Sequence, residues 1–203
     1  MPPARPIATP AKDDQPRTAE RILDIAERLV QTRGFNGFSY ADVANELGIT
    51  KASLHYHFAG KAELGQALID RYTQRFSSAL GGIDREAPAA REKLEAYAEL
   101  YADVLRGQRM CMCGILAAEY QTLPEQMRHA VIRFFDENRK WLAATLAEGQ
   151  RDHTLSIAGP LDDVADSIIS TLEGAMLVAR PYGDSERFSA TTRRLLSSLS
   201  VGA

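Results

Sequence analysis

The sequence predicts an all-α fold, and two patterns along the chain support that prediction. Apolar residues recur at spacings of three and four in one segment after another, which is the period of a helix that buries one side. No segment shows the apolar–polar alternation of a half-buried strand, and no internal repeat is evident. The chain is therefore expected to be a set of packed helices.

The first helix is expected to begin at Thr18, whose hydroxyl can cap it, and to end at Gly34. Its buried stripe consists of Ile22, Ile25, Ala26, Leu29 and Val30. Residues 1–16 contain five prolines and little that could pack. They are predicted to be a disordered tail.

Two short helices joined by a tight turn are expected next. Ser39 can cap the first, and Gly48 ends it where a left-handed residue is needed, a conformation that glycine adopts without steric cost. Thr50 can cap the second, in which Leu54 and Phe58 share the inner side. This is the helix-turn-helix pattern, whose second helix enters the major groove of DNA. An ordinary helical hairpin in a bundle has the same pattern.

Several longer motifs recur in this region in a characteristic order and spacing. They are Phe38-Ser39-Tyr40-Ala41-Asp42-Val43-Ala44, Gly48-Ile49-Thr50, Leu54-His55-Tyr56-His57-Phe58 and Lys61-Ala62-Glu63-Leu64. Together they resemble the N-terminal signature of the TetR family of transcriptional regulators, over roughly residues 17–64. The sequence departs from that signature at His55, where the family more often carries tyrosine.

The resemblance implies which residues meet double-stranded DNA. Ser39 and Thr50 are expected to meet phosphates through hydroxyl and backbone N–H groups, and Lys61 through its charge. Backbone bracing is expected from Tyr56 and His57, although His57 lies toward the inner side of the helix, where packing is an equal alternative. The residues expected to reach base edges are Lys51, Ser53 and His55.

The rest of the chain reads as a larger helical body. A helix starting at Gly60-Lys61 and ending at Gly81-Gly82 would join it to the first three helices. Further helical patterns cover about 88–106, 110–121, 125–150, 161–181 and 185–199. The resemblance implies a helix-turn-helix DNA-binding domain over 17–62 and a ligand-binding and dimerisation domain over 63–203.

Composition agrees with this division. The 203 residues are 45% hydrophobic and 25% charged, as in a soluble globular protein. Neither a membrane-spanning run nor a signal peptide is evident, so a cytoplasmic location is expected. Residues 1–80 carry 10 basic and 9 acidic residues, whereas the remainder carries 14 and 18. The acidity thus lies in the part that need not approach phosphates.

In the body, the resemblance implies a homodimer and a pocket for a small-molecule effector. Small and apolar residues in one of the last helices could form the dimer surface or the internal core: Ile168, Ile169, Leu172, Ala175, Met176 and Ala179. Pocket candidates, each of which could equally be core or surface, are Tyr97, Tyr101, Tyr120, Phe134, Trp141, Met176 and Arg180. Arg180 would suit an anionic ligand if it faced inward.

The two cysteines, Cys111 and Cys113, lie at an expected helix start beside Arg109. The helix dipole and the arginine would lower a thiol pKa there. Three interpretations stay open: inert buried thiols, thiols that sense oxidants or electrophiles, and zinc binding, for which no second ligand pair is present. A disulfide is disfavoured by the strained C-x-C ring. The segment resembles a subset of TetR-like regulators that respond to electrophiles such as acrylate.

The sequence therefore predicts a DNA-binding transcriptional regulator, a repressor released from a palindromic operator by a ligand or by reaction of its thiols. Within this class, the alternative is a non-covalent ligand sensor with inert cysteines. Outside it, the alternatives are a helical interaction module without DNA binding and an enzyme. No hydrolase, P-loop, dinucleotide or zinc-protease motif is present, so no catalytic residue, cofactor or metal is expected.

Overall fold

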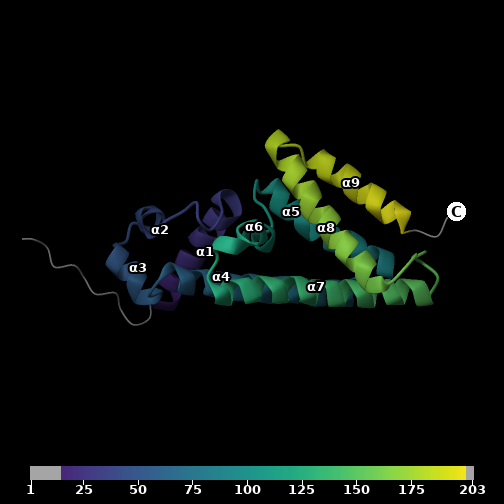
Figure 1. The fold of residues 1–203 in the computed structure, drawn as a ribbon, viewed down its shortest axis with the longest axis horizontal. Coiled ribbons are helices and arrows are strands. Elements are labelled where there is room, and N and C mark those ends of the chain that lie inside the picture. The colour runs from purple at the N-terminus through teal and green to yellow at the C-terminus, as the bar shows by residue number, and fades with distance from the viewer. Residues whose placement is uncertain (1–14, 200–203) are drawn as a thin grey trace, which may run out of the picture.

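The structure, a computed structural model, describes residues 15–199 and contains helices without any β-strand in that range. Figure 1 shows a small group of helices at one end of the molecule and a larger group at the other. The helices are α1 (Gln15–Arg33), α2 (Tyr40–Leu47), α3 (Lys51–His57), α4 (Lys61–Glu86), α5 (Ala90–Arg106), α6 (Met112–Ala118), α7 (Glu125–Arg151), α8 (Leu161–Ala179) and α9 (Ser185–Ser198), with 3-10 turns η1 (Tyr120–Thr122) and η2 (Arg180–Tyr182). The predicted all-α class is confirmed.

The head consists of α1, α2 and α3, and the expected capping residues form it. Ser39 and Asp42 make a reciprocal capping box at the start of α2, and Gly48 ends that helix in the left-handed region with φ +68°. The Thr50 hydroxyl accepts from the Ser53 N–H at 3.1 Å and starts α3. Leu54 is fully buried under α3. The two short helices and their turn are therefore as predicted.

Two predicted boundaries were wrong. Helix α1 begins at Gln15, so Thr18 lies inside the helix instead of capping it. Helix α4 runs through Gly81-Gly82 to Glu86. Buried Leu80 and Ile83 flank the glycines, so packing of this side holds the helix together across them. Of the predicted tail, 1–16, the first 14 residues lie outside the described part of the chain. Residues 15 and 16 belong to the start of α1.

An ion cluster fixes α4 against α1. The Arg71 guanidinium, whose side chain is only 10% exposed, bonds Glu27 at 2.7 Å and Asp24 at 2.8 Å, and also reaches Glu20 at 3.2 Å. Because Arg71 is largely sheltered and bonded to several carboxylates, this contact is stronger than an isolated surface pair. Helix α4 therefore ties the head to the body.

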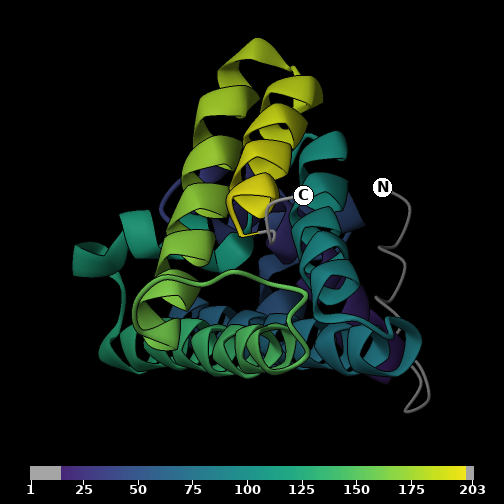
Figure 2. The same cartoon turned by 90° about the vertical axis from the view of Figure 1, so that its right-hand side faces the viewer.

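The body is built around α4, α5, α7 and α8, with α9 packed on α5 and α8. In Figure 2, α8 and α9 stand over the long α7. Aromatic rings fill the interior: Phe76 lies 5.2 Å from Phe134, 6.0 Å from Tyr97 and 6.1 Å from Tyr101, measured between ring centroids. Across residues 15–199, each helix is too short or too polar to span a lipid bilayer.

The apolar residues of α8 that were candidates for a dimer surface belong to the core of the chain itself. All of them are buried: Ile168, Ile169, Leu172, Ala175, Met176 and Ala179. A different part of this region is exposed and apolar, since Leu177, Val178 and Tyr182 are 64%, 60% and 64% exposed. The exposed large apolar side chains of α8 and η2 are therefore these three.

Candidate functional site

Helix α3 presents a polar face at the tip of the head. Lys51, His55 and Tyr56 are exposed, with Tyr56 at 69%. Ser53 and His57 are half-buried, and the His57 ring lies edge-on to Tyr56 at 5.4 Å. Buried Leu54 and Phe58 hold the opposite side of the helix. The predicted residues of α3 therefore lie on or beside one exposed face.

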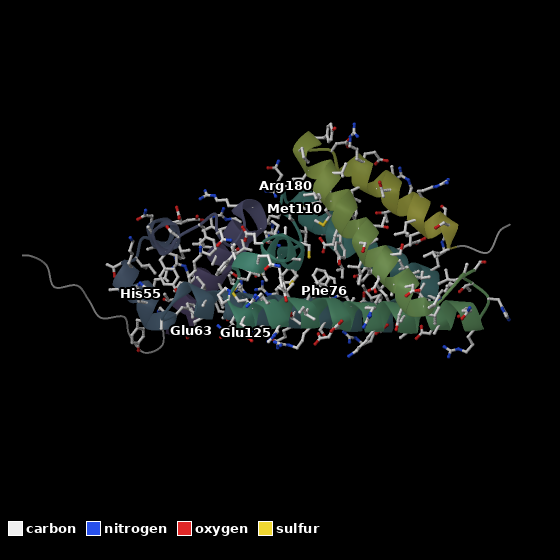
Figure 3. The ribbon with its side chains drawn as sticks, in the orientation of Figure 1. His55, Glu63, Phe76, Met110, Glu125 and Arg180 are labelled. Atoms are coloured by element: carbon white, nitrogen blue, oxygen red, sulfur yellow. The ribbon has the colours of Figure 1, made fainter. Side chains whose placement is uncertain are left out.

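His55 is oriented by two contacts. Its ring lies 4.8 Å from the ring of Tyr40, and its Nδ1 is 3.1 Å from the Ala59 carbonyl oxygen. Because that oxygen can only accept, Nδ1 carries the hydrogen, and Nε2 of the neutral ring is left as an acceptor. A held ring with an outward acceptor can bond an amino group on a base edge, such as N4 of cytosine or N6 of adenine. Figure 3 shows His55 at the end of the head, away from Phe76 in the body.

Lys61, for which a phosphate contact is predicted, has its ammonium group engaged within the head. Its ammonium group donates to the Phe38 carbonyl oxygen at 2.5 Å and lies over the rings of Phe35 and Phe38, 4.7 and 4.4 Å from their centroids. Burial lowers its pKa. The ammonium is therefore bonded inside the head, where it joins the start of α4 to the chain before α2.

The helix-start hydroxyls are also engaged locally. Ser39 Oγ donates to Asp42 at 2.6 Å, and this bond lowers the pKa of Asp42. Thr50 accepts from the Ser53 N–H. Both residues are exposed, so a phosphate could approach them from outside while the caps remain intact.

In the body, the two thiols are buried where α6 begins. Cys111 is 1% and Cys113 0% exposed. Burial raises the pKa of both well above the ordinary value, and the nearby Glu173 carboxyl raises them further. The lowered thiol pKa expected from the sequence is therefore wrong. Arg109, which was expected to contribute to it, donates to the Gln31 side chain at 3.3 Å instead.

Glu173 of α8 is the polar group that faces these thiols. Its carboxyl lies near Cys111, whose sulfur accepts from the Tyr72 hydroxyl at 3.6 Å. The stem of Glu173 is partly exposed, whereas the carboxyl is buried, and burial raises its pKa to about 7. Tyr72, Cys111 and Glu173 thus form a buried polar cluster between α4 and α8.

The other predicted effector residues are not gathered in one place. Met176 is fully buried in the protein core. Trp141 lies on α7, where its indole donates to Asp84 at 3.0 Å and stacks on the Tyr97 ring. Tyr120 lies in η1, with Arg128 of α7 over its ring. Arg128 and Trp141 are 13 positions apart on one helix, which separates them by about 20 Å. Tyr120 and Trp141 therefore lie at separate places along α7.

Two contacts between the head and the body were not foreseen. The Glu119 carboxylate, at the end of α6, accepts from the Phe35 N–H at 2.7 Å and from the Asn36 N–H at 3.3 Å. Arg180, a candidate for binding an anion, donates to the Thr32 carbonyl oxygen at 2.5 Å. Figure 3 shows Arg180 over the junction of the two parts. The end of α1 is therefore held by α6 on one side and by η2 on the other.

Comparison with known proteins covers both parts of this arrangement. Residues 22–68 match the family model described as bacterial regulatory proteins, tetR family, and residues 90–195 match the model described as tetracyclin repressor-like, C-terminal domain. The chain belongs to the TetR family of transcriptional regulators. This membership confirms the predicted resemblance and the prediction that the protein is a regulator and not an enzyme.

Solved structures of the TetR family share the whole fold. A TetR-family regulator from Agrobacterium tumefaciens is 32% identical with a TM-score of 0.89, covering 92% of this chain and 100% of its own. A TetR regulator from Legionella pneumophila is 31% identical with a TM-score of 0.83, covering 90% and 97%. The HTH-type transcriptional repressor NemR of Escherichia coli K12 is 25% identical over 172 residues, which are 80% of this chain and 84% of NemR.

Sequence reasoning about this TetR-family chain missed Glu173 and Glu119. Glu173 lies on α8 between apolar residues, and a carboxylate on the inner side of an otherwise apolar helix is a signal that could have marked it. Glu119 gave no comparable signal, because its partners lie 83 and 84 positions away in the sequence. Its role depends on how α6 docks against the turn after α1.

Proposed function

We propose that this TetR-family regulator is a homodimeric repressor that binds a palindromic operator through α3 and is released by a small molecule bound in the body. The single observation that carries the proposal is that α3 exposes a polar face at the tip of the head while Leu54 and Phe58 bury its opposite side. Repression is supported by the similarity to NemR, a repressor by its description. Two-fold symmetry would place two α3 helices on neighbouring major grooves.

Within the head, Lys51, Ser53 and His55 are proposed to reach base edges, and Ser39, Thr50, Tyr56 and His57 to position the phosphates. Lys61 is proposed to act from inside the head, by holding the chain on which α2 begins. His55 would favour a base edge that offers an amino group, because its Nε2 is left as an acceptor.

Release is proposed to pass through α6. One end of the segment around α6 holds the thiols beside Glu173, and its other end holds Glu119 on the turn after α1. A molecule that favours another position of α6 would weaken the hold on α1. It can shift the balance only by its different affinity for the two arrangements, so DNA must in turn weaken its binding.

The non-covalent alternative is favoured over reaction of the thiols. Both cysteines are buried with raised pKa values, so little thiolate is present at neutral pH. A ligand that fits the body without bond formation requires no such activation.

Binding to the DNA upstream of the gene tests the proposal, measured by fluorescence anisotropy at 50 and 200 mM salt with a shuffled fragment as control. We expect the upstream fragment to bind more tightly than the shuffled one, and the affinity to fall by about a hundredfold or more between the two salts, because several phosphates are neutralised. DNA recognition would be contradicted if the upstream and shuffled fragments bound with equal, salt-insensitive affinity and no fragment of a genomic pool bound more tightly.

A further inference from the structure

A hollow of about 580 Å³ opens where α6, α7 and α8 meet. Its walls are mostly apolar, with Met110, Ile115, Phe135, Ile169 and Leu177 among them. This volume lies within the range of small-molecule sites, and apolar walls with a few polar groups are typical of them. The hollow is separate from the candidate pocket residue Trp141, which it does not include.

Glu173 is the buried polar group in the wall of this hollow. Its Oε1 is buried and finds no hydrogen-bond partner anywhere in residues 15–199. A buried carboxyl oxygen without a partner is costly, because it has lost its water and gained nothing in return. The missing partner is therefore a donor that the described chain does not supply.

The position of the carboxyl is closely defined by α6. A Cβ built on Gly114 would lie 2.1 Å from Glu173 Oε2, so the absence of a side chain at Gly114 makes room for the carboxyl against the helix. The carboxyl also lies near the buried Cys111 thiol. These contacts hold Glu173 at the boundary between the hollow and the buried thiols.

The charges around the hollow have one sign. Asp166 and Glu173 line it, and no basic side chain of the described chain does. Arg139 of α7 lies outside the lining and pairs with Asp166 at 3.8 Å. A positively charged or hydrogen-donating group would be attracted there, and a carboxylate would be repelled.

We propose that the hollow between α6, α7 and α8 binds a small, mainly apolar amine whose nitrogen donates to the Glu173 carboxyl. The amine site itself does not depend on the proposed function, but the role of the amine as the effector that releases DNA rests on it. The apolar part of the amine fills the space between Ile115, Phe135 and Ile169, and the ammonium replaces the donor that Oε1 lacks. Because Glu173 packs against Gly114 of α6, an occupied hollow repositions the helix that Glu119 directly follows.

The test uses matched compounds on the full-length protein at pH 8. The probes are benzylamine and cyclohexylmethylamine, each compared with its carbon-matched alcohol and carboxylate in thermal unfolding and calorimetric titration. We expect the amines to raise the melting temperature more than the alcohols, and the carboxylates to have no effect. In Glu173→Gln the affinity for the amines should fall about tenfold or more, because a charged hydrogen bond is lost, whereas in the exposed-site control Glu137→Gln it should not change.

Three results would overturn the proposal: no amine binding better than its alcohol, a carboxylate binding better than its amine, or an amine preference that survives Glu173→Gln. A separate arm repeats the DNA titration with amine present. Release of DNA by the amine in the unchanged protein, but not in Glu173→Gln, supports the effector role. Amine binding without release would contradict that role and leave the amine site standing, so the two failures are distinguishable.

Discussion

At pH 8 the Glu173→Gln variant should be about 3 kcal/mol more stable to unfolding than the unchanged protein. The Glu173 carboxyl has its pKa raised from 4.5 to about 7 by burial, so the folded state holds its proton more tightly than the unfolded chain does. Stability is therefore lost as the pH rises from about 4.5 through about 7, and each pKa unit corresponds to about 1.4 kcal/mol. The glutamine amide of the variant stays neutral, so the variant does not lose this stability as the pH rises.

The measurement is urea unfolding of both proteins at pH 5 and pH 8, at one fixed protein concentration because a dimer makes stability depend on it. At pH 5 the difference between the variants should shrink to about 1 kcal/mol or less, because the carboxyl is protonated in the folded state and pH 5 lies only about half a pH unit above its ordinary pKa of 4.5. Glu137→Gln, an exposed position on α7, serves as the control and should show no such dependence. A stability difference that is the same at both pH values would contradict a buried, protonated Glu173.

Removing the Glu119 carboxylate should loosen the head while leaving the body folded. In Glu119→Ala the backbone N–H groups of Phe35 and Asn36 lose their acceptor. Hydrogen bonds to a charged group contribute about 1.5–3 kcal/mol each, and the longer Asn36 bond contributes less, so we expect a loss of about 2 kcal/mol. Asn36 also donates to Thr122 at 2.7 Å, which keeps the turn attached.

Hydrogen exchange resolves this effect by region. Protection should fall in α2, α3 and the turn between α1 and α2, and stay unchanged in α7 and α8. Glu119→Gln keeps an acceptor oxygen and should lose about half as much. Uniform loss of protection across the whole chain, or equal losses in the alanine and glutamine variants, would be inconsistent with a local hold on the turn.

The local features of the fold could be predicted because each depends on residues close in sequence. Ser39 and Gly48 begin and end α2, and Leu54 anchors α3, as the spacing indicated. The end of α4 could not be predicted in the same way. Gly81-Gly82 is a strong local stop signal, but buried residues on either side of it carry the helix through.

The candidate sites depended on contacts that the sequence does not express. A thiol at a helix start beside an arginine should have a lowered pKa, yet Cys111 is buried next to Glu173, which is 62 positions away, and its pKa is raised. Lys61 is a second residue whose contacts within the fold are not evident from the sequence. Its charge and position suited a phosphate, but the Phe38 carbonyl oxygen and two rings already surround its ammonium group.

Whether α3 reads DNA is tested most directly by comparing the affinities of Lys51→Ala and Lys140→Ala for the upstream fragment. Both substitutions remove one exposed lysine, from α3 in the first case and from α7 in the second. We expect the dissociation constant to rise about ten- to a hundredfold for Lys51→Ala and to stay within about twofold for Lys140→Ala. Equal effects from the two substitutions, or an effect from Lys140→Ala alone, would contradict the reading of DNA by α3.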